Sequence, residues 1–177
     1  MRNRTLLAAV AAALLLVPLL AASTSGAAEH RRVTIRDACD PATFDAALQN
    51  PNACVRPGGG VAFDQFIGQL MAQGRDAAWR FAPSKLSLSA GGSIDAYNGG
   101  GEFHTFTEVA AFGGGCVPQL NQILGLTAVP ECANAGALFA TTGVAPGAEL
   151  EGAPLAAGTH LFQCLIHPWM RTTVVVD

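Results

Sequence analysis

Residues 158–176, GTHLFQCLIHPWMRTTVVV, contain two segments that we interpret as the last two β-strands of the chain, GTHLFQC and RTTVVV. The loop between them, CLIHPWM, places Cys164, His167 and Met170 three residues apart. Pro168 disfavours helical backbone at His167, so we expect the loop to stay open. A thiolate, an imidazole and a thioether in one short loop are donors that suit a soft or borderline metal ion.

A trigonal set of two His and one Cys, with a weak axial Met, describes a blue-copper site. The loop supplies one His, so another must come from elsewhere. His160 is four residues before Cys164 on the same strand face, roughly 13 Å away, too far to share one ion. His30 lies near the expected new N-terminus, where we expect a frayed chain. His104 follows the glycine-rich loop NGGGE and remains. The predicted ligands of one copper ion are His104, Cys164, His167 and Met170.

Two other interpretations of these donors stay open at the level of sequence. For Cys164 considered alone, a buried structural thiol is the better interpretation. Zinc accepts one Cys and two His, although it gains little from a thioether.

Residues 1–28 have the layout of a secretory signal peptide. Arg2 and Arg4 precede an apolar run over residues 6–22, and small residues follow up to a plausible cleavage point. Retention of this segment as a membrane anchor is the alternative. Cleavage would leave 149 residues with eight basic and 13 acidic side chains, a net charge of −5. Such a charge, without basic runs, excludes nucleic acid as the expected partner.

Export predicts an oxidising compartment, in which disulfides persist. We predict the pairs Cys39–Cys54 and Cys116–Cys132 from proximity in sequence. Four cysteines allow three connectivities, so the pairing is a choice among alternatives. Cys164 is left without a partner.

The remaining pattern predicts helices early in the chain and strands later. Asp40 followed by Pro41 is typical of a helix N-cap. An amphipathic helix is expected over residues 63–71, ended by Gly74, with Met71 on its apolar face. Later segments favour strands, and residues 120–124 favour one helical turn. The expected strands are residues 33–36, 85–89, 94–98, 103–109, 137–142, 158–164 and 171–176.

The chain resembles the cupredoxins, the small blue copper proteins that include plastocyanin, pseudoazurin and amicyanin. GTHLFQC resembles the family's GTYxFxC, HPWM resembles its HPxM, and the C-x-x-H-x-x-M spacing is most similar to amicyanin. FAPSKLSLSAGGSIDAYN with GGGEFHTF resembles the strand pair that delivers the first His. The resemblance covers residues 79–177 and departs at Thr105, where many relatives carry an Asn that ties the two ligand loops together.

The resemblance implies an all-β, antiparallel Greek-key β-sandwich as a single domain over residues 29–177. Residues 79–177 would form the copper-binding core and residues 29–78 a helical N-terminal extension. It also implies a mobile electron carrier in the periplasm or outside the cell, whose redox partners dock on an apolar patch near His167. Simple packing of Pro168 and Trp169 is the alternative to that patch.

Two other functions compete with electron transfer. Copper storage or delivery is one, although the expected mature chain carries only two methionines, Met71 and Met170. A copper enzyme is the other, but the spare histidines are too few for a second copper cluster. We therefore expect a monomeric protein that is not an enzyme and is not stably inserted in a membrane after cleavage.

Overall fold

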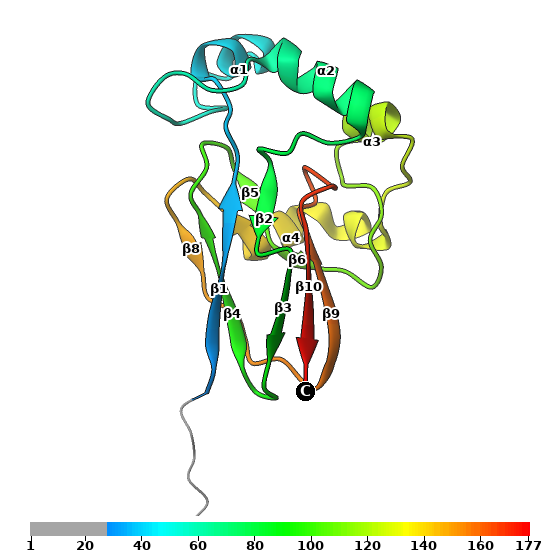
Figure 1. Ribbon diagram of the computed structural model, residues 1–177. Coiled ribbons are helices and arrows are strands. Elements are labelled where there is room, and N and C mark those ends of the chain that lie inside the picture. The colour runs from blue at the N-terminus through cyan, green and yellow to red at the C-terminus, as the bar shows by residue number, and fades with distance from the viewer. Residues whose placement is uncertain (1–27) are drawn as a thin grey trace, which may run out of the picture.

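The computed structural model describes residues 28–177, in which two β-sheets form a sandwich (Figure 1). The order of strands is β2-β1-β4-β8 in the first sheet and β3-β10-β9-β6 in the second, and β5 pairs with β7 in a small third sheet. The predicted signal peptide, apart from Ala28, lies outside the described residues. The strands are β1 (His30–Arg36), β2 (Arg80–Ala82), β3 (Lys85–Leu88), β4 (Ser93–Asn98), β5 (His104–Thr105), β6 (Thr107–Glu108), β7 (Gly143–Val144), β8 (Glu149–Leu150), β9 (Gly158–Gln163) and β10 (Arg171–Val176).

The predicted β-sandwich is confirmed, but the expectation of purely antiparallel sheets is wrong. β1 runs parallel to β4, and β3 runs parallel to β10. Parallel neighbours require a crossover of a dozen or more residues, and long stretches of chain separate both pairs. The remaining pairs of named strands are antiparallel, including β9 with β10.

The β9–β10 pair positions the proposed ligand loop. Arg171 opens β10 opposite Gln163 at the end of β9, so residues 164–170 connect the two strands directly. Thr172, Val174 and Val176 are buried along β10, with less buried residues between them, as expected for a strand with one face on the core.

Two helices of the N-terminal segment lie across one end of the sandwich, α1 (Pro41–Leu48) and α2 (Phe63–Gln73) (Figure 1). The Asp40 side chain caps α1 by accepting from Thr43 N, and Gly74 ends α2 with φ 68°, both as predicted. Met71 was predicted to be in the core, but this is wrong, because its side chain is 74% exposed. Phe66 and Leu70 are the fully buried members of the apolar stripe, and Met71 lies beyond its edge.

The middle of the chain is more helical than the sequence pattern indicates. It contains α3 (Pro118–Leu124), the 3-10 helix η1 (Pro130–Asn134) and α4 (Ala135–Thr142). The strand predicted over residues 137–142 is therefore wrong. Alanines favour the helix, and the Thr141 and Thr142 hydroxyls bond back to the carbonyls of Ala137 and Leu138, which satisfies these β-branched residues within α4.

The strand predicted over residues 103–109 is divided in two. β5 pairs with β7, whereas β6 pairs with β9 in the second sheet. Phe106 lies between them, and its backbone N–H donates to Thr142 O at 2.8 Å. The chain thus changes partner immediately after His104 and Thr105.

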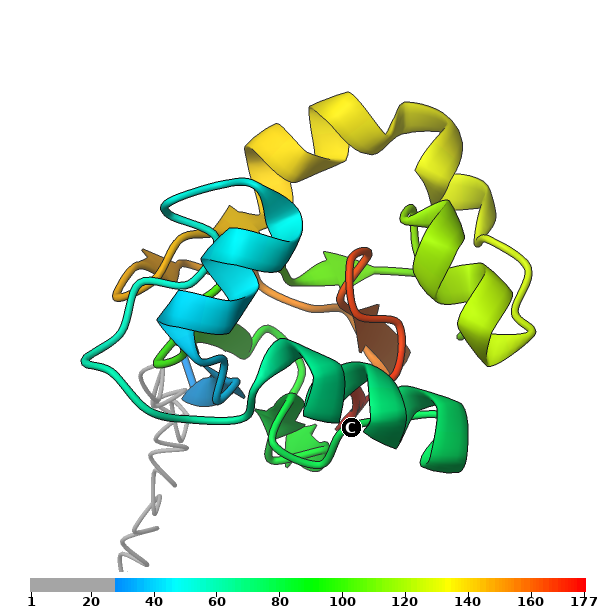
Figure 2. The ribbon, with the colours of Figure 1, turned by 90° about the horizontal axis from the view of Figure 1, so that it is seen from above.

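Both predicted disulfides are confirmed, Cys39–Cys54 and Cys116–Cys132, and Cys164 is a buried free cysteine. Among residues 28–177, no helix has the length and apolar character needed to cross a bilayer. Viewed from above, helices α1 to α4 surround the segment that precedes β10 (Figure 2).

Candidate metal centre

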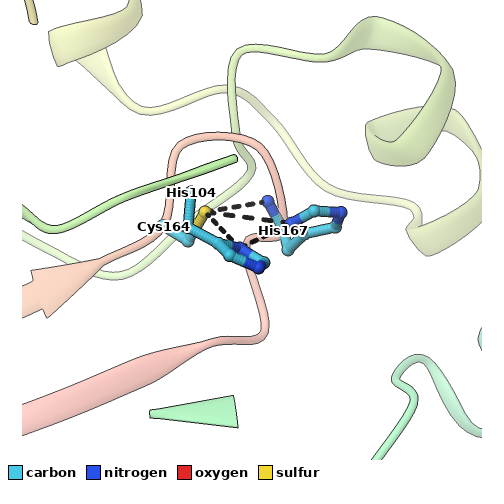
Figure 3. A group of neighbouring side chains, drawn as sticks. All are labelled: His104, Cys164 and His167. Atoms are coloured by element: carbon cyan, nitrogen blue, oxygen red, sulfur yellow. Dashed lines mark hydrogen bonds between the residues drawn. The ribbon is translucent and has the colours of Figure 1, made fainter. Parts of the chain in front are cut away.

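Three of the four predicted ligands converge at the helix-covered end of the sandwich. His104 begins β5, Cys164 follows β9, and His167 lies in the loop before β10. The Cys164 Sγ atom is 3.8 Å from His104 Nδ1 and 4.0 Å from His167 Nδ1, and the two Nδ1 atoms are 3.2 Å apart (Figure 3). His104 and Cys164 are fully buried, and His167 is 4% exposed.

The spacing of these donor atoms fits one metal ion. A point about 2.1 Å from all three atoms exists within this triangle, close to ordinary metal–nitrogen distances. Three lone pairs that face one another without solvent are costly unless a proton or a cation lies between them. His104, Cys164 and His167 could therefore hold a metal ion.

Backbone hydrogen bonds hold the ligand loop in shape. Cys164 N donates to Met170 O at 3.0 Å, which closes the base of the loop, and Met170 N donates to His167 O at 2.9 Å. The Cys164 sulfur accepts from His167 N at 3.4 Å and from Thr105 N at 3.5 Å. These N–H groups stabilise a thiolate before any metal arrives.

Met170 is fully buried at the end of this loop. Its backbone bonds to Cys164 and His167 keep it next to both of those residues along the loop. Its role as the axial ligand stays a prediction.

The Thr105 hydroxyl ties the two ligand-bearing segments together. Thr105 is fully buried beside His104, and its Oγ1 accepts from Leu165 N at 2.8 Å. The hydroxyl of Thr105 thus provides a link between the two segments at the position where the sequence departs from the family pattern. Thr105 and Leu165 join β5 to the start of the ligand loop, so the distance between His104 and Cys164 is constrained.

A buried carboxylate outside the predicted ligand set, that of Asp37, orients His104. His104 Nε2 is 2.9 Å from Asp37 Oδ2, and both side chains are completely buried. Asp37 also accepts from the backbone N–H groups of Gly101 and Glu102. Since Nε2 donates to the carboxylate, the neutral ring of His104 carries its lone pair on Nδ1, which faces Cys164 and His167.

This arrangement shifts the pKa values of three groups in the metal-free protein. Burial opposes charge on His104, but the hydrogen bonds to Asp37 and Cys164 outweigh it and raise the pKa of His104 to about 9. Burial likewise raises the pKa of Cys164, but the two imidazoles outweigh it and hold that pKa well below its ordinary value. Burial also raises the pKa of Asp37, but its bonds from His104 and Gly101 lower it overall. The site thus favours a thiolate and an imidazolium, whose proton a metal ion would displace.

His167 lies in a different environment, made largely of aromatic rings. Its ring centroid is 5.4 Å from that of Trp169 and 6.3 Å from that of Phe66 on α2, both edge-on. Glu102 Oε2 is 3.8 Å from His167 Nε2 and accepts from the indole N–H of Trp79. Burial raises the pKa of Glu102, although His167 and Trp79 partly oppose this.

Asp37, Glu102 and His104 form a second group of close donor atoms. Its oxygens already have partners, because Asp37 accepts from backbone N–H groups and Glu102 accepts from Trp79. We therefore interpret this group as hydrogen-bonded support for His104 and His167. A weak signal was available in the sequence: Asp37 directly follows the segment VTIR, which favours a strand, and Glu102 directly follows GGG, two residues before His104.

The other two histidines lie away from the donor triangle. His160 is in β9, as predicted, and its Nδ1 is 2.6 Å from Glu108 Oε1. The pKa of His160 is raised by its bonds to the Ala156 carbonyl and to Glu108. The expectation of a frayed chain at His30 is wrong, because His30 belongs to β1 and its Nδ1 is 2.8 Å from Ser93 Oγ.

No family model and no curated protein match this sequence. Solved structures that resemble it include a purple cupredoxin from Nitrosopumilus maritimus, at 14% identity over 83% of this chain and 99% of that one, with a TM-score of 0.45. Amicyanin from Paracoccus versutus matches at 15% identity over 55% and 73% of the two chains, with a TM-score of 0.36. A mutant fern plastocyanin matches at 18% identity over 56% and 89%, with a TM-score of 0.36. At these identities the similarity concerns the path of the chain alone.

Proposed function

We propose that this chain is an exported blue copper protein that carries single electrons by cycling between Cu(I) and Cu(II). The proposed ligands are His104, Cys164, His167 and Met170. The observation that carries the proposal is the buried triangle of two imidazole nitrogens and one cysteine sulfur. Two nitrogens and a thiolate in trigonal array are the donors of a type 1 copper site, and a thioether next in the loop suits its weak axial position.

The surrounding residues would keep the ligands still during electron transfer. Copper, when bound, supplies the one-electron redox couple. Asp37 holds the proton on His104 Nε2, and the Thr105 hydroxyl joins β5 to the ligand loop at Leu165. Because the loop is also closed by the bond from Cys164 N to Met170 O, both oxidation states would meet nearly the same ligand geometry.

Burial of the ligands favours electron transfer over copper delivery. Handover of a metal requires an incoming ligand to reach the ion, whereas Cys164 is fully buried and His167 nearly so. An electron needs no such opening. Two disulfides support export to an oxidising compartment, the periplasm or the exterior, with residues 1–28 as the cleaved leader and residues 29–177 as one domain.

The direct test is to express the full chain with its leader, purify the exported protein and add Cu(II). We expect one copper per chain and an intense blue absorption. Cys164→Ser should abolish the colour, because the thiolate produces it, whereas His160→Ala should retain it. A colourless wild-type protein after copper addition contradicts the proposal.

A second measurement separates a carrier from a delivery protein. A carrier should show a reversible one-electron wave and keep its copper in both oxidation states when challenged with a chelator. Rapid loss of Cu(I) to the chelator would support delivery instead.

A further inference from the structure

A hollow of about 300 Å³ opens beside the ligand loop, next to Trp169 and Trp79. Three arginines line it, from the α2–β2 connection, from β2 and from the start of β10, together with one acidic residue. The charged residues are Arg75, Arg80, Arg171 and Asp76. The hollow therefore carries a charge of +2, against −7 for the rest of residues 29–177.

The arginines of this hollow have no acidic partner in the described part of the chain. Arg80 donates only to the carbonyls of Ala77 and Ala78, and Arg171 donates to Pro168 O and Gly113 O. Elsewhere, by contrast, Arg31 and Arg32 pair with Glu29 and Glu149. The positive charge at the hollow is thus not neutralised by the chain's own carboxylates.

Asp76 offsets one of the three positive charges, which leaves the net charge of +2, and its carboxylate bonds to the local backbone. It is buried, and its Oδ1 accepts from Ala78 N at 2.8 Å. Trp169 Nε1 is also buried and has no hydrogen-bond partner among the described residues. An indole N–H without a partner, on a side chain that lines the hollow next to guanidinium groups without a carboxylate partner, favours an anionic acceptor.

The hollow and the candidate metal centre are both in contact with the ring of Trp169. Trp169 lines the hollow and stands edge-on to His167, with ring centroids 5.4 Å apart. Trp79 also lines it and donates to Glu102, whose carboxylate is 3.8 Å from His167 Nε2. Since α2 and Trp169 cover His167, a partner on this side would meet Trp169 before it met the histidine.

We propose that the arginine-rimmed hollow is the docking site for an electron-transfer partner with a carboxylate-rich surface, and that the electron passes through Trp169 to His167. The inference rests on the proposed function. One electron moves between the partner's redox centre and copper: when Cu(II) is reduced to Cu(I), the partner is oxidised by one electron, and no bond forms or breaks. The opposite charge of the hollow and of the remaining surface would orient the encounter.

The first test measures anion binding without relying on copper chemistry. Hexacyanochromate(III), a redox-inert paramagnetic trianion, is added to the isotopically labelled protein, and the two indole N–H resonances are observed. Trp169→Phe identifies the resonance of Trp169. We expect selective broadening of that resonance in the wild-type protein, and at least a fivefold loss of broadening in Arg75→Glu/Arg80→Glu.

The matched control is Arg31→Glu/Arg32→Glu, which changes the net charge by the same amount. These residues lie four to five positions before Arg36, which pairs with Arg80 in the β1–β2 ladder, so they are about 13–17 Å further along β1. The strand β1 begins at the end of the sandwich opposite α2 (Figure 1). Equal loss of broadening in both double variants would overturn the proposal, because it would indicate a response to net charge alone.

A peptide of six glutamates tests whether protein carboxylates compete for the site. We expect it to restore the Trp169 resonance in the presence of hexacyanochromate(III), whereas a peptide of six lysines should not. No restoration by the glutamate peptide would overturn the assignment to a carboxylate-rich partner. If the glutamate double variant fails to fold by circular dichroism, Arg75→Gln/Arg80→Gln replaces it, with at least a twofold loss of broadening expected.

The last test measures electron transfer in the copper-loaded protein. Oxidation by hexacyanoferrate(III) should slow at least tenfold in Arg75→Glu/Arg80→Glu and less than twofold in the control, while reduction by the cationic hexaammineruthenium(II) should not slow. Unchanged rates with hexacyanoferrate(III) would overturn the proposed entry route. If the protein never turns blue with copper, the proposed function is wrong. If it turns blue but shows no selectivity for anions at Trp169, only the proposed docking site is wrong.

Discussion

The ligand loop and the N-terminal segment contribute to the candidate metal centre in different ways. The loop, residues 164–170, carries three of the four proposed ligands and holds its own shape through backbone hydrogen bonds. The segment over residues 29–78 carries no proposed ligand, yet Asp37 bonds to His104 and Phe66 packs on His167. Donor atoms are thus concentrated in one short stretch, whereas the groups that orient and bury them come from a distant one.

This difference has a physical origin. A metal needs several donors at one point, and a short loop supplies them with little loss of chain entropy. Orientation and burial need packed neighbours on other sides, which only another part of the chain can provide. Removing a neighbour should therefore weaken the site even where every ligand remains.

The largest effect is expected from Phe66→Ala. Phe66 is buried against Trp79, Trp169 and His167, so its loss should lower the free energy of unfolding by about 3–5 kcal/mol. The control is Met71→Ala on the same helix, where the exposed side chain predicts a change within about 0.5 kcal/mol. Urea unfolding of both variants measures the contrast. Similar changes in the free energy of unfolding for the two variants would mean that α2 does not stabilise the end of the sandwich where the proposed ligands lie.

Asp37→Asn should weaken copper binding by roughly 10- to 100-fold, because it removes the charge that orients His104 and turns an amide donor toward backbone N–H groups. Competition with a chelator of known affinity measures the change. Glu108→Gln is the control: it alters another carboxylate–histidine pair, with His160, but that histidine is not a proposed ligand. If Asp37→Asn binds copper as tightly as the control, the role assigned to Asp37 is wrong.

Thr105→Val tests the link between the two ligand-bearing segments. It leaves the buried N–H of Leu165 without an acceptor and should cost about 1–2 kcal/mol in the free energy of unfolding. Thr105→Ser keeps the hydroxyl and should lose less. The blue absorption band should also broaden or shift only in the Val variant. Identical spectra and free energies of unfolding in the two variants would mean that the bond from Leu165 N to Thr105 Oγ1 does not hold the two segments together.

The smallest effect concerns the metal-free protein between pH 6.5 and pH 9. Below pH 9 the folded state holds one proton on His104, whose pKa is raised to about 9, and Cys164 favours the thiolate, because the two imidazoles hold its pKa well below its ordinary value. In the unfolded state, above the ordinary His pKa of 6.5 and below the ordinary Cys pKa of 9.0, one proton sits on the thiol instead. Both states bind equal numbers of protons, so we expect nearly constant stability in this range.

Below pH 6.5 the unfolded state gains a proton that the folded pair does not, so stability should decrease as the pH falls. Cys164→Ser removes the thiol from this balance. The bond to Asp37 still acts to raise the pKa of His104, although the contribution of Cys164 is lost, so the variant should show a decline in stability as the pH rises from 6.5 where the wild type is flat. His160, with its raised pKa, adds a shallow decline to both proteins. Thermal unfolding across the pH series measures the difference.

The strands and the ligand loop were predictable because their signals are local. The β9–β10 pair, the Asp40 cap and the end of α2 at Gly74 follow from alternation, capping and backbone preference. α4 was misjudged because its threonines satisfy their hydroxyls within the helix, which a strand-like composition does not reveal. The predicted burial of Met71 was wrong because the apolar stripe of α2 is wider than the part of the protein that packs against that helix.

The sequence by itself determined which donor atoms this protein offers and how three of them are spaced, since a covalent chain of seven residues leaves them little freedom. Only the tertiary structure decided that Asp37 meets His104 across 67 positions and that Phe66 and Trp169 cover His167. It also decided that arginines from separate elements line one hollow. Contacts of this kind depend on the packing of whole elements, and no short-range pattern of residue types encodes them.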